Sequence, residues 1–562
     1  MRGGSWKTWV MAGLFLGISA WAFGNEELIR LAQNPSEWPL YGRDYANTRY
    51  SPLDQINTAN VGRLKVAWIQ SLGTLRGQES VPIKIGDTLY VTTSWPNNVY
   101  AVDARTGRLK WKYVSDTPAD AQQYACCDVV NRGAAYGNGK IFFGRLDGVL
   151  IALDAQTGRE LWRATVVDYK AGYTITSPPI VIKDKVITGY AGAEFGARGA
   201  VVAYDMNTGR ELWRTFTVGP GPEYDNSWHT DAWKTGGGTA WYVASYDPEA
   251  NLVYYGTGNP APWNTAVRPG DNKWSASIIA LNPDDGRIVW GFQTTPQDAW
   301  DWDAENELVL VDLVIKGRKV PALMQANKNG FFYVLDRKTG KFIQGDKYYP
   351  HLNWARGLDA NGRPIEIPEM RPSLTQYVDY VCPVFWGGKN WPPMAYNPKT
   401  GLVYMPGNNL CMSIQHREVT YTKGALYIGS KHEHKPGPGG GPAKNLGQFR
   451  AFDPVNLKLV WTIDERYPGW GGALTTAGGL VFYGNQEGEF KAVDARTGKI
   501  LWRFYAGSGI VAAPISYAVG GKQYIAVSVG LGGEYSLLPG EAGKNLPNEV
   551  NLGGYLVAFT LE

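Results

Sequence analysis

A short motif recurs eight times along this 562-residue chain, and it constrains the fold more than any other feature. Most copies have an apolar residue, Ala, any residue and Asp, followed by Thr-Gly-Arg or Thr-Gly-Lys and then Trp. Short strand-forming runs separated by Gly and Asn turns surround the motif, as at residues 140–143 and 480–483. The copies end at Trp68, Trp111, Trp162, Trp213, Trp290, Ile343, Trp461 and Trp502. Such repeats of short strands predict an all-β fold, an eight-bladed β-propeller.

Each part of the motif has a physical role in a blade. The strand ends at Asp, Thr-Gly makes the hairpin turn, and Trp begins the next strand. The Trp side chain is large enough to fill the gap between neighbouring blades. The first copy lacks earlier strands, and residues 555–559 lack a following Trp strand. We therefore expect the N- and C-terminal strands to join and close the ring.

No linker divides the chain, so residues 23–562 are predicted to form a single domain. The Gly/Pro-rich residues 434–442 are interpreted as a loop. The first residues resemble a signal peptide, predicted at residues 1–22. Arg2 and Lys7 precede the apolar residues 10–18, and Ala20-Trp21-Ala22 fits a cleavage site. A membrane anchor is the alternative, but the apolar run is short for a membrane span.

Export predicts a periplasmic protein without stable membrane insertion. Four cysteines, enough for two disulfides, fit an oxidising compartment. The net charge is only +4, and no basic stripe is present, which argues against nucleic-acid binding.

Four further strings of residues carry chemical information. They are Cys126-Cys127-Asp128-Val129-Val130-Asn131-Arg132, Gly236-Gly237-Gly238-Thr239-Ala240-Trp241, Gly192-Ala193-Glu194-Phe195-Gly196 with Gly258-Asn259-Pro260-Ala261-Pro262-Trp263, and Trp300-Asp301-Trp302-Asp303. With these strings the chain resembles the pyrroloquinoline quinone (PQQ)-dependent methanol and ethanol dehydrogenases. The resemblance extends from about Trp38 to Phe559.

The resemblance implies a PQQ site between two faces. A disulfide between the adjacent Cys126 and Cys127 would pack on one face of PQQ, and Trp241 would stack on the other. Asp301 matches the catalytic base of the family. The remaining pair of cysteines, Cys382 and Cys411, is expected to form the second disulfide.

Further positions match residues that hold the carboxylates and quinone oxygens of PQQ. The predicted cofactor-binding residues are Glu79, Cys126, Cys127, Arg132, Thr176, Gly192, Ala193, Trp241, Lys328, Asn390 and Trp470. Lys328 would stabilise the negative charge that develops on the quinone oxygens. The chain departs from the family pattern at Tyr190-Ala191, where relatives often carry Ser, so one carboxylate contact is in doubt there.

The resemblance also implies a metal ion, with Glu194, Asn259, Asp301 and Asp303 as ligands. Hard cations prefer such oxygen donors. Calcium members of the family usually have a small neutral residue at the position of Asp303, whereas lanthanide members have a second Asp. The added carboxylate suits a trivalent ion. We therefore expect a lanthanide ion, with Ca²⁺ as the alternative.

The implied reaction is oxidation of short-chain primary alcohols, such as ethanol or methanol, to aldehydes. No CxxCH haem motif occurs, so the expected electron acceptor is a separate soluble c-type cytochrome. The resemblance also allows a homodimer. Two alternative functions are a non-catalytic propeller scaffold and a PQQ enzyme that acts on sugars or polymeric alcohols. His432-Glu433-His434 could suggest a metal site, but its Lys/Pro/Gly-rich surroundings argue against one.

Overall fold

The computed structural model describes Met1, residues 24–538 and residues 540–562. The predicted signal peptide, residues 1–22, lies outside the described residues except for Met1. In the described parts, α-helix is confined to α1 (Glu26–Gln33) and α2 (Gly540–Glu549), and most other regular structure is β-strand. None of the described helices is both long and apolar enough to cross a membrane.

Within the described residues, seven four-stranded sheets and one five-stranded sheet make up the body. In six sheets the strands lie side by side in chain order. The first three are β3 (Ile83–Ile85), β4 (Thr88–Thr92), β5 (Val99–Asp103) and β6 (Leu109–Tyr113); β7 (Ala135–Gly137), β8 (Lys140–Gly144), β9 (Val149–Asp154) and β10 (Glu160–Thr165); and β11 (Ile180–Ile182), β12 (Lys185–Thr188), β13 (Ala200–Asp205) and β14 (Glu211–Phe216). The next three are β15 (Ser245–Asp247), β16 (Leu252–Gly256), β17 (Ser277–Leu281) and β18 (Ile288–Gln293); β19 (Val309–Ile315), β20 (Arg318–Ala326), β21 (Phe331–Asp336) and β22 (Phe342–Lys347); and β26 (Ala395–Asn397), β27 (Leu402–Asn408), β30 (Gly447–Asp453) and β31 (Lys458–Glu465). The other two contain strands from both ends of the chain: β1 (Tyr50–Ser51) with β32 (Leu474–Thr476), β33 (Leu480–Gly484), β34 (Glu489–Asp494) and β35 (Ile500–Tyr505); and β2 (Leu64–Ser71) with β36 (Ile515–Val519), β37 (Lys522–Val529) and β38 (Tyr555–Leu561).

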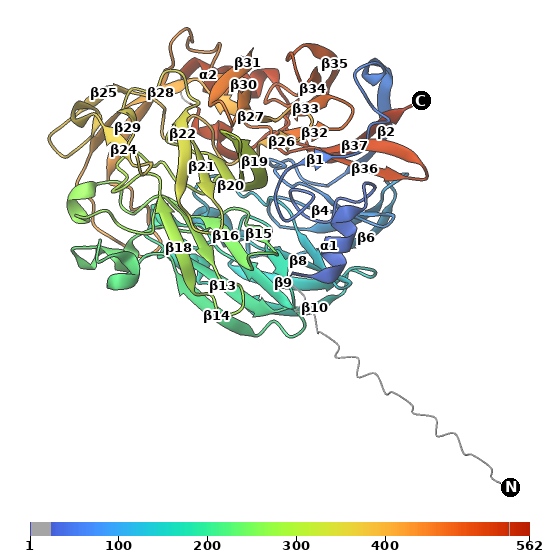
Figure 1. Cartoon of the computed structure of the whole chain (residues 1–562), viewed down its shortest axis with the longest axis horizontal. Helices are drawn as coiled ribbons and strands as arrows, with labels where there is room; N and C mark the ends of the chain where they lie inside the picture. Colours follow the sequence, from blue (N-terminus) through green and yellow to red (C-terminus); the bar gives the residue numbers. More distant parts are fainter. Residues whose placement is uncertain (2–23, 539) are drawn as a thin grey trace.

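Neighbouring sheets contact each other through their first strands. Strand β7 contacts β11, β15 contacts β19, β26 contacts β32, and β32 contacts β36. Figure 1 shows the blue strand β2 beside the red strands β36 and β37, and β2 pairs antiparallel with β38. This sheet therefore combines strands from the N-terminal and C-terminal parts of the described chain. The predicted all-β propeller class is confirmed.

The repeat motif forms the same local structure in successive sheets. Its Ala lies directly opposite the Trp of the next strand, and the register shifts by a bulge beside this pair. The pairs are Ala101 with Trp111, Ala152 with Trp162, Ala203 with Trp213, Ala280 with Trp290, Ala451 with Trp461, Ala492 with Trp502, and Ala558 with Trp68. A bulge bends and twists its strand, so the motif determines the twist at the outer edge of each blade.

The Asp-to-Gly part of the motif makes the turn and receives the Trp of the preceding blade. Asp154 Oδ1, for example, accepts hydrogen bonds from Thr157 N at 2.8 Å and Thr157 Oγ1 at 2.8 Å. The following Gly packs against the previous Trp ring at Gly107/Trp68, Gly158/Trp111, Gly209/Trp162, Gly286/Trp213, Gly340/Trp290 and Gly498/Trp461. Five of these indoles also donate to a carbonyl of the next repeat. The predicted packing of Trp between blades is confirmed.

We expect Gly158→Ala to destabilise the protein more than Gly139→Ala. Both glycines have positive φ, of 70° and 74°, so an added Cβ strains each backbone by about 1–2 kcal/mol. A Cβ at Gly158 would also lie 2.5 Å from Trp111 Cε3, whereas a Cβ at Gly139 would meet nothing within 4 Å. The extra loss of stability should be about 1–3 kcal/mol, measurable by scanning calorimetry. Equal melting temperatures for the two variants would contradict Trp docking as the cause.

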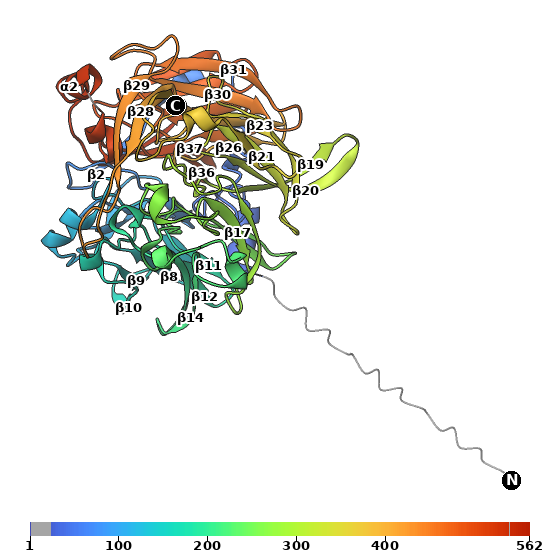
Figure 2. The ribbon, with the colours of Figure 1, turned by 90° about the vertical axis from the view of Figure 1, so that its left-hand side faces the viewer.

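Two small sheets lie outside the body. They are β23 (Ala355–Leu358) with β24 (Pro364–Glu366), and β25 (Val378–Val381) with β28 (Leu410–His416) and β29 (Ser430–Pro436). Figure 2 shows α2 beside β28 and β29. The predicted loop at residues 434–442 is therefore wrong for its first three residues, because they complete β29 by pairing with β28.

The topology brings chemically important segments to one end of the sheets. In an antiparallel pair, the start of the first strand lies beside the end of the second. Segments that enter β3, β7, β11, β15, β19, β26 and β32 therefore lie at the same end as segments that leave β12, β16 and β20. The entering segments contain Glu79, Arg132, Thr176, Trp241, Asp301, Asp303, Asn390 and Trp470, and the leaving segments contain Glu194, Asn259 and Lys328.

Candidate active site

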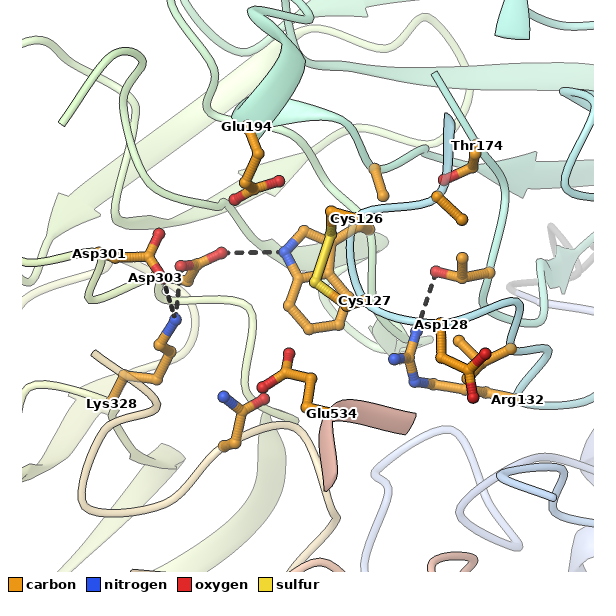
Figure 3. A pocket seen from close by; sticks show the side chains of 16 residues that line it. Cys126, Cys127, Asp128, Arg132, Thr174, Glu194, Asp301, Asp303, Lys328 and Glu534 are labelled. Atoms are coloured by element: carbon orange, nitrogen blue, oxygen red, sulfur yellow. Dashed lines mark hydrogen bonds and ion pairs between the residues drawn. A yellow bond between two sulfur atoms is a disulfide. The ribbon is translucent and has the colours of Figure 1, made fainter. Parts of the chain in front are cut away.

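A cavity lies among these segments (Figure 3). It combines a disulfide, an indole, several carboxylates and two cationic side chains. Its lining residues are Ala125, Cys126, Cys127, Asp128, Val130, Arg132, Thr174, Thr176, Ala191, Glu194, Trp241, Asp301, Asp303, Lys328, Asn390 and Glu534. The cavity therefore gathers ten of the fifteen predicted cofactor-binding and metal-binding residues.

Adjacent cysteines form part of the cavity wall. Cys126 is bonded to Cys127, and Cys382 is bonded to Cys411, as the sequence predicted. Asp128 follows the first disulfide with φ of 70°, in the left-handed region that non-glycine residues rarely adopt. Its Oδ2 accepts a hydrogen bond from Gly533 N at 2.9 Å. Asp128 therefore joins the disulfide segment to the chain near the C-terminus.

Trp241 is connected to the acidic residues by its indole nitrogen. Trp241 Nε1 donates a hydrogen bond to Asp303 Oδ2 at 2.9 Å. The preceding glycines allow close backbone contact with the segment of Asn259. Gly238 N donates to Asn259 O at 2.8 Å, and a Cβ on Gly237 would lie 2.4 Å from the same oxygen. The two motifs that the sequence singled out separately are thus one unit.

Arg132 forms the cationic side of the cavity. Its Nε lies 3.0 Å from Glu79 Oε2, and its Nη1 donates to Thr176 Oγ1 at 2.9 Å. The guanidinium carbon also lies 5.1 Å from the ring centroid of Trp241 and 4.6 Å from that of Trp391. Burial raises the pKa of Glu79 to about 8, although the charge of Arg132 opposes this rise. These contacts fix the guanidinium of Arg132 at the cavity, where it presents hydrogen-bond donors of the kind that pair with carboxylates.

Asp301 and Asp303 share one cation. Lys328 Nζ lies 2.8 Å from Asp303 Oδ1 and 3.3 Å from Asp301 Oδ2 (Figure 3). Burial raises the pKa of Asp301 well above its usual value, and the charge of Lys328 opposes the rise. Burial lowers the pKa of Lys328, but Asp301 and Asp303 hold it well above its usual value. Asp301 has φ of 70°, and such strain clusters at functional sites.

Several oxygen atoms near this pair have no hydrogen-bond partner among the described residues. Asp301 Oδ1 and Asn259 Oδ1 are buried and unpartnered. Glu194 is partly exposed, and desolvation of its carboxyl group, followed by the charge of Asp303, raises its pKa to about 7. A buried oxygen without a donor is costly, so a cation would stabilise this arrangement. In residues 24–538 and 540–562, no group of three or more His, Cys, Asp or Glu side chains can hold a metal ion by itself.

Five predicted residues do not form part of the cavity wall. Glu79 and Asn259 lie behind it, as described above, and Trp470 is buried with its Nε1 unpartnered. Gly192 and Ala193 precede Glu194 at the start of η4 (Ala193–Phe195). A Cβ on Gly192 would lie 2.3 Å from Gly172 O, so this glycine allows a close approach of two chain segments.

Asn390 lines the cavity, but its amide is bonded to the backbone. Its Nδ2 donates to Trp386 O at 3.0 Å, and its Oδ1 accepts from Trp391 N at 2.8 Å. These bonds fix the orientation of the amide.

Sequence reasoning missed three polar residues of the wall. They are Asp128, Thr174 and Glu534. Thr174 pairs with Ala191 through two backbone hydrogen bonds, so it lies beside the position where relatives often carry Ser. Asp128 belongs to the string with the two cysteines, which was a usable signal. Glu534 follows two glycines near the end of the chain, and no motif marked it.

The two histidines of the sequence His432-Glu433-His434 have an aromatic environment. The His432 ring centroid lies 4.8 Å from that of Trp263, and the His434 centroid lies 4.4 Å from that of Trp386. Burial lowers the pKa of His432 to about 4 and that of His434 to about 3. Both therefore pack as neutral rings among aromatic side chains.

Comparison with known proteins shows consistent similarity over nearly the whole chain. The family described as "PQQ: Glucose/ethanol/alcohol dehydrogenase, beta-propeller domain" matches residues 38–345 and 442–525. The lanthanide-dependent methanol dehydrogenase of Methylacidiphilum fumariolicum is 45% identical, covering 97% of this chain and 96% of its own length. The quinoprotein alcohol dehydrogenase PedH of Pseudomonas putida is 43% identical, covering 98% and 95%. A solved europium-containing methanol dehydrogenase superposes with a TM-score of 0.92 at 45% identity, covering 96% of this chain and 100% of that one.

Proposed function

Because the chain belongs to the family of PQQ-dependent alcohol dehydrogenases, we propose that it oxidises short-chain primary alcohols to aldehydes with PQQ and a lanthanide ion. The observation that carries this proposal is the Asp301–Asp303–Lys328 cluster, which faces a cavity with the Cys126–Cys127 disulfide in its wall. Buried ionisable side chains that face a cavity are typical of catalytic sites, which favours an enzyme over a scaffold protein.

The residues present fit PQQ. Its three carboxylates need cationic and donor groups, and Arg132, Thr176 and Lys328 face the cavity. The disulfide and the Trp241 indole offer two surfaces for a flat ring system. When bound, PQQ supplies the acceptor for the two electrons of the alcohol, and the metal ion supplies a Lewis acid.

Asp301 has the role of general base in this proposal. Its Oδ1 is buried and has no hydrogen-bond partner among the described residues, so it can accept the proton of the substrate hydroxyl. Lys328 holds the other oxygen of the same carboxylate at 3.3 Å, which orients it. Lys328 also places a positive charge beside the cavity, where it would stabilise negative charge on the quinone oxygens.

The proposed metal ligands are Glu194, Asn259, Asp301 and Asp303. The unpartnered Oδ1 atom of Asn259 supports this set, because a hard cation would satisfy it. Asp303 adds a second carboxylate beside Asp301, and the added negative charge favours a trivalent ion over Ca²⁺. The names of the lanthanide-dependent and europium-containing relatives support the same choice.

We further propose that residues 1–22 direct the protein to the periplasm. There a soluble c-type cytochrome would accept the electrons one at a time. The absence of a CxxCH motif from the sequence supports a separate acceptor.

The test is reconstitution of the purified protein with PQQ and either La³⁺ or Ca²⁺, followed by a dye-linked assay with a panel of alcohols and glucose. We expect bound PQQ to be visible in the near-ultraviolet spectrum. Ethanol or methanol should be oxidised faster with La³⁺, and reduced enzyme should reduce an added c-type cytochrome. Activity with NAD⁺ alone, or a higher kcat/KM for glucose than for ethanol, would overturn the proposal.

A further inference from the structure

Glu534 lies in the segment after the second strand of its sheet. In three other sheets the same segment carries a proposed site residue. Glu194, Asn259 and Lys328 each follow the second strand of a sheet, namely β12, β16 and β20. Glu534 follows β37, the second strand of the sheet that contains β36, β38 and β2, and it is the second residue of η9 (Gly533–Leu537). The fold therefore delivers Glu534 to the same end of the propeller, and its side chain lines the cavity (Figure 3).

The segment before Glu534 is held by close contacts. A Cβ on Gly532 would lie 2.0 Å from Gly77 Cα, so the two backbones touch. Gly533 has φ of 74° and donates its N–H to Asp128 Oδ2 at 2.9 Å. A Cβ on Gly533 would lie 2.4 Å from Glu79 Oε1. These glycines bring the chain next to the disulfide segment and leave Glu534 little freedom to turn away from the cavity.

One oxygen of Glu534 lacks a donor. The Oε2 atom is buried, although the residue as a whole is partly exposed, and it has no hydrogen-bond partner among the described residues. Burial raises the pKa of Glu534 to about 7, against the charges of Lys328 and Arg132. An unpartnered buried oxygen is costly in the free protein, so a ligand that donates a hydrogen bond to it gains affinity.

The chemistry of the cavity indicates which ligand donates. The carboxylates and quinone oxygens of PQQ are acceptors, and the ring N–H is the one donor that PQQ offers, so a contact with the cofactor is the competing role that PQQ binding tests. The reacting hydroxyl of the alcohol is assigned to Asp301. We propose that Glu534 accepts a hydrogen bond from a second hydroxyl group of the substrate. The enzyme then prefers short diols to monohydric alcohols of the same length. This inference rests on the proposed function and names its substrate class.

The experiment compares 1,2-propanediol with 1-propanol in the wild type, Glu534→Leu, Glu534→Gln and the control Glu541→Leu. Glu541 is an exposed glutamate of α2. The ratio of kcat/KM for the diol to that for 1-propanol should fall about tenfold or more in Glu534→Leu, since a hydrogen bond to a charged group is lost. Glu534→Gln keeps a carbonyl acceptor and should retain part of the preference. Glu541→Leu should not change the ratio.

Calorimetric titration of the PQQ-loaded protein with each alcohol repeats the comparison without turnover. The wild type should bind the diol more tightly, and Glu534→Leu should lose that difference. An unchanged ratio in Glu534→Leu, or an equal loss for both alcohols, would overturn the inference. Weaker PQQ binding in that variant with no change in the ratio would also overturn it, because Glu534 would then serve the cofactor. Failure of the wild type to oxidise any alcohol would refute the proposed function instead, and the titrations would still decide the role of Glu534.

Discussion

Replacing Asp301 by Asn is expected to lower kcat for alcohol oxidation by about 10²–10⁴-fold, the range that a general base contributes. Asn has the same shape but cannot accept the substrate proton at a buried oxygen. The Oδ1 atom of Asp301 is free to accept it, and Lys328 orients the other oxygen at 3.3 Å. Steady-state assays with a dye acceptor and saturating PQQ measure the effect.

The control for this variant is Asp312→Asn on strand β19. Asp312 is exposed, so its substitution should leave kcat unchanged. PQQ binding, followed by near-ultraviolet absorbance, should persist in both variants. Wild-type kcat in Asp301→Asn would remove Asp301 from the proposed mechanism, whereas loss of PQQ binding would point to a structural role.

Replacing Asp303 by Ala is expected to reduce La³⁺-supported turnover by about 100-fold or more. Replacing a residue that only supports a metal ligand lowers metal affinity or activity by about 10–100-fold, and loss of a carboxylate ligand itself should lower them further. Asp303 is 3% exposed and is held by Lys328 at 2.8 Å and by Trp241 at 2.9 Å, so its carboxylate is fixed at the cavity. The measurements are activity and the PQQ spectrum during titration of metal-free protein with La³⁺.

Asp303→Ala should still fold, and its thermal melting curve measures this. Asp303→Glu keeps the charge and serves as the matched variant, which should retain La³⁺ binding better than Asp303→Ala. If Ca²⁺ alone restores full activity to the wild type and La³⁺ adds nothing, the lanthanide proposal fails and a calcium enzyme remains.

The repeat determined the fold class because its interactions are local and recur in each blade. Ala152 opposes Trp162 across one hairpin, and Asp154 makes the turn that receives the Trp of the preceding blade. Every residue of that contact lies in the motif or in the adjacent copy. The pairing of β2 with β38 was predictable for the same reason, since each terminal fragment lacked the strands that the other supplied.

Much of the candidate site was also predictable, because its key residues lie in short contiguous strings. Cys126 and Cys127 are neighbours in the chain, and Asp301 and Asp303 are two residues apart. Such strings can be recognised in the sequence without knowledge of how the blades pack. The Gly/Pro-rich stretch that begins at His434 was less informative. Its composition indicated a loop, but pairing with β28 made it part of a strand, since a partner strand can override local preference.

The tertiary structure decided the interactions that join different blades. Lys328 bridges Asp301 and Asp303, Arg132 pairs with Glu79, and Asp128 holds Gly533, although these partners are far apart or unrelated in sequence. Glu534 is the extreme case, because nothing around it in the chain marks a functional position. Only the antiparallel return of β37 brings it to the end of the propeller where the other site residues lie. A sequence pattern records contacts between residues near in the chain, whereas contacts between side chains of different sheets depend on how the sheets pack together.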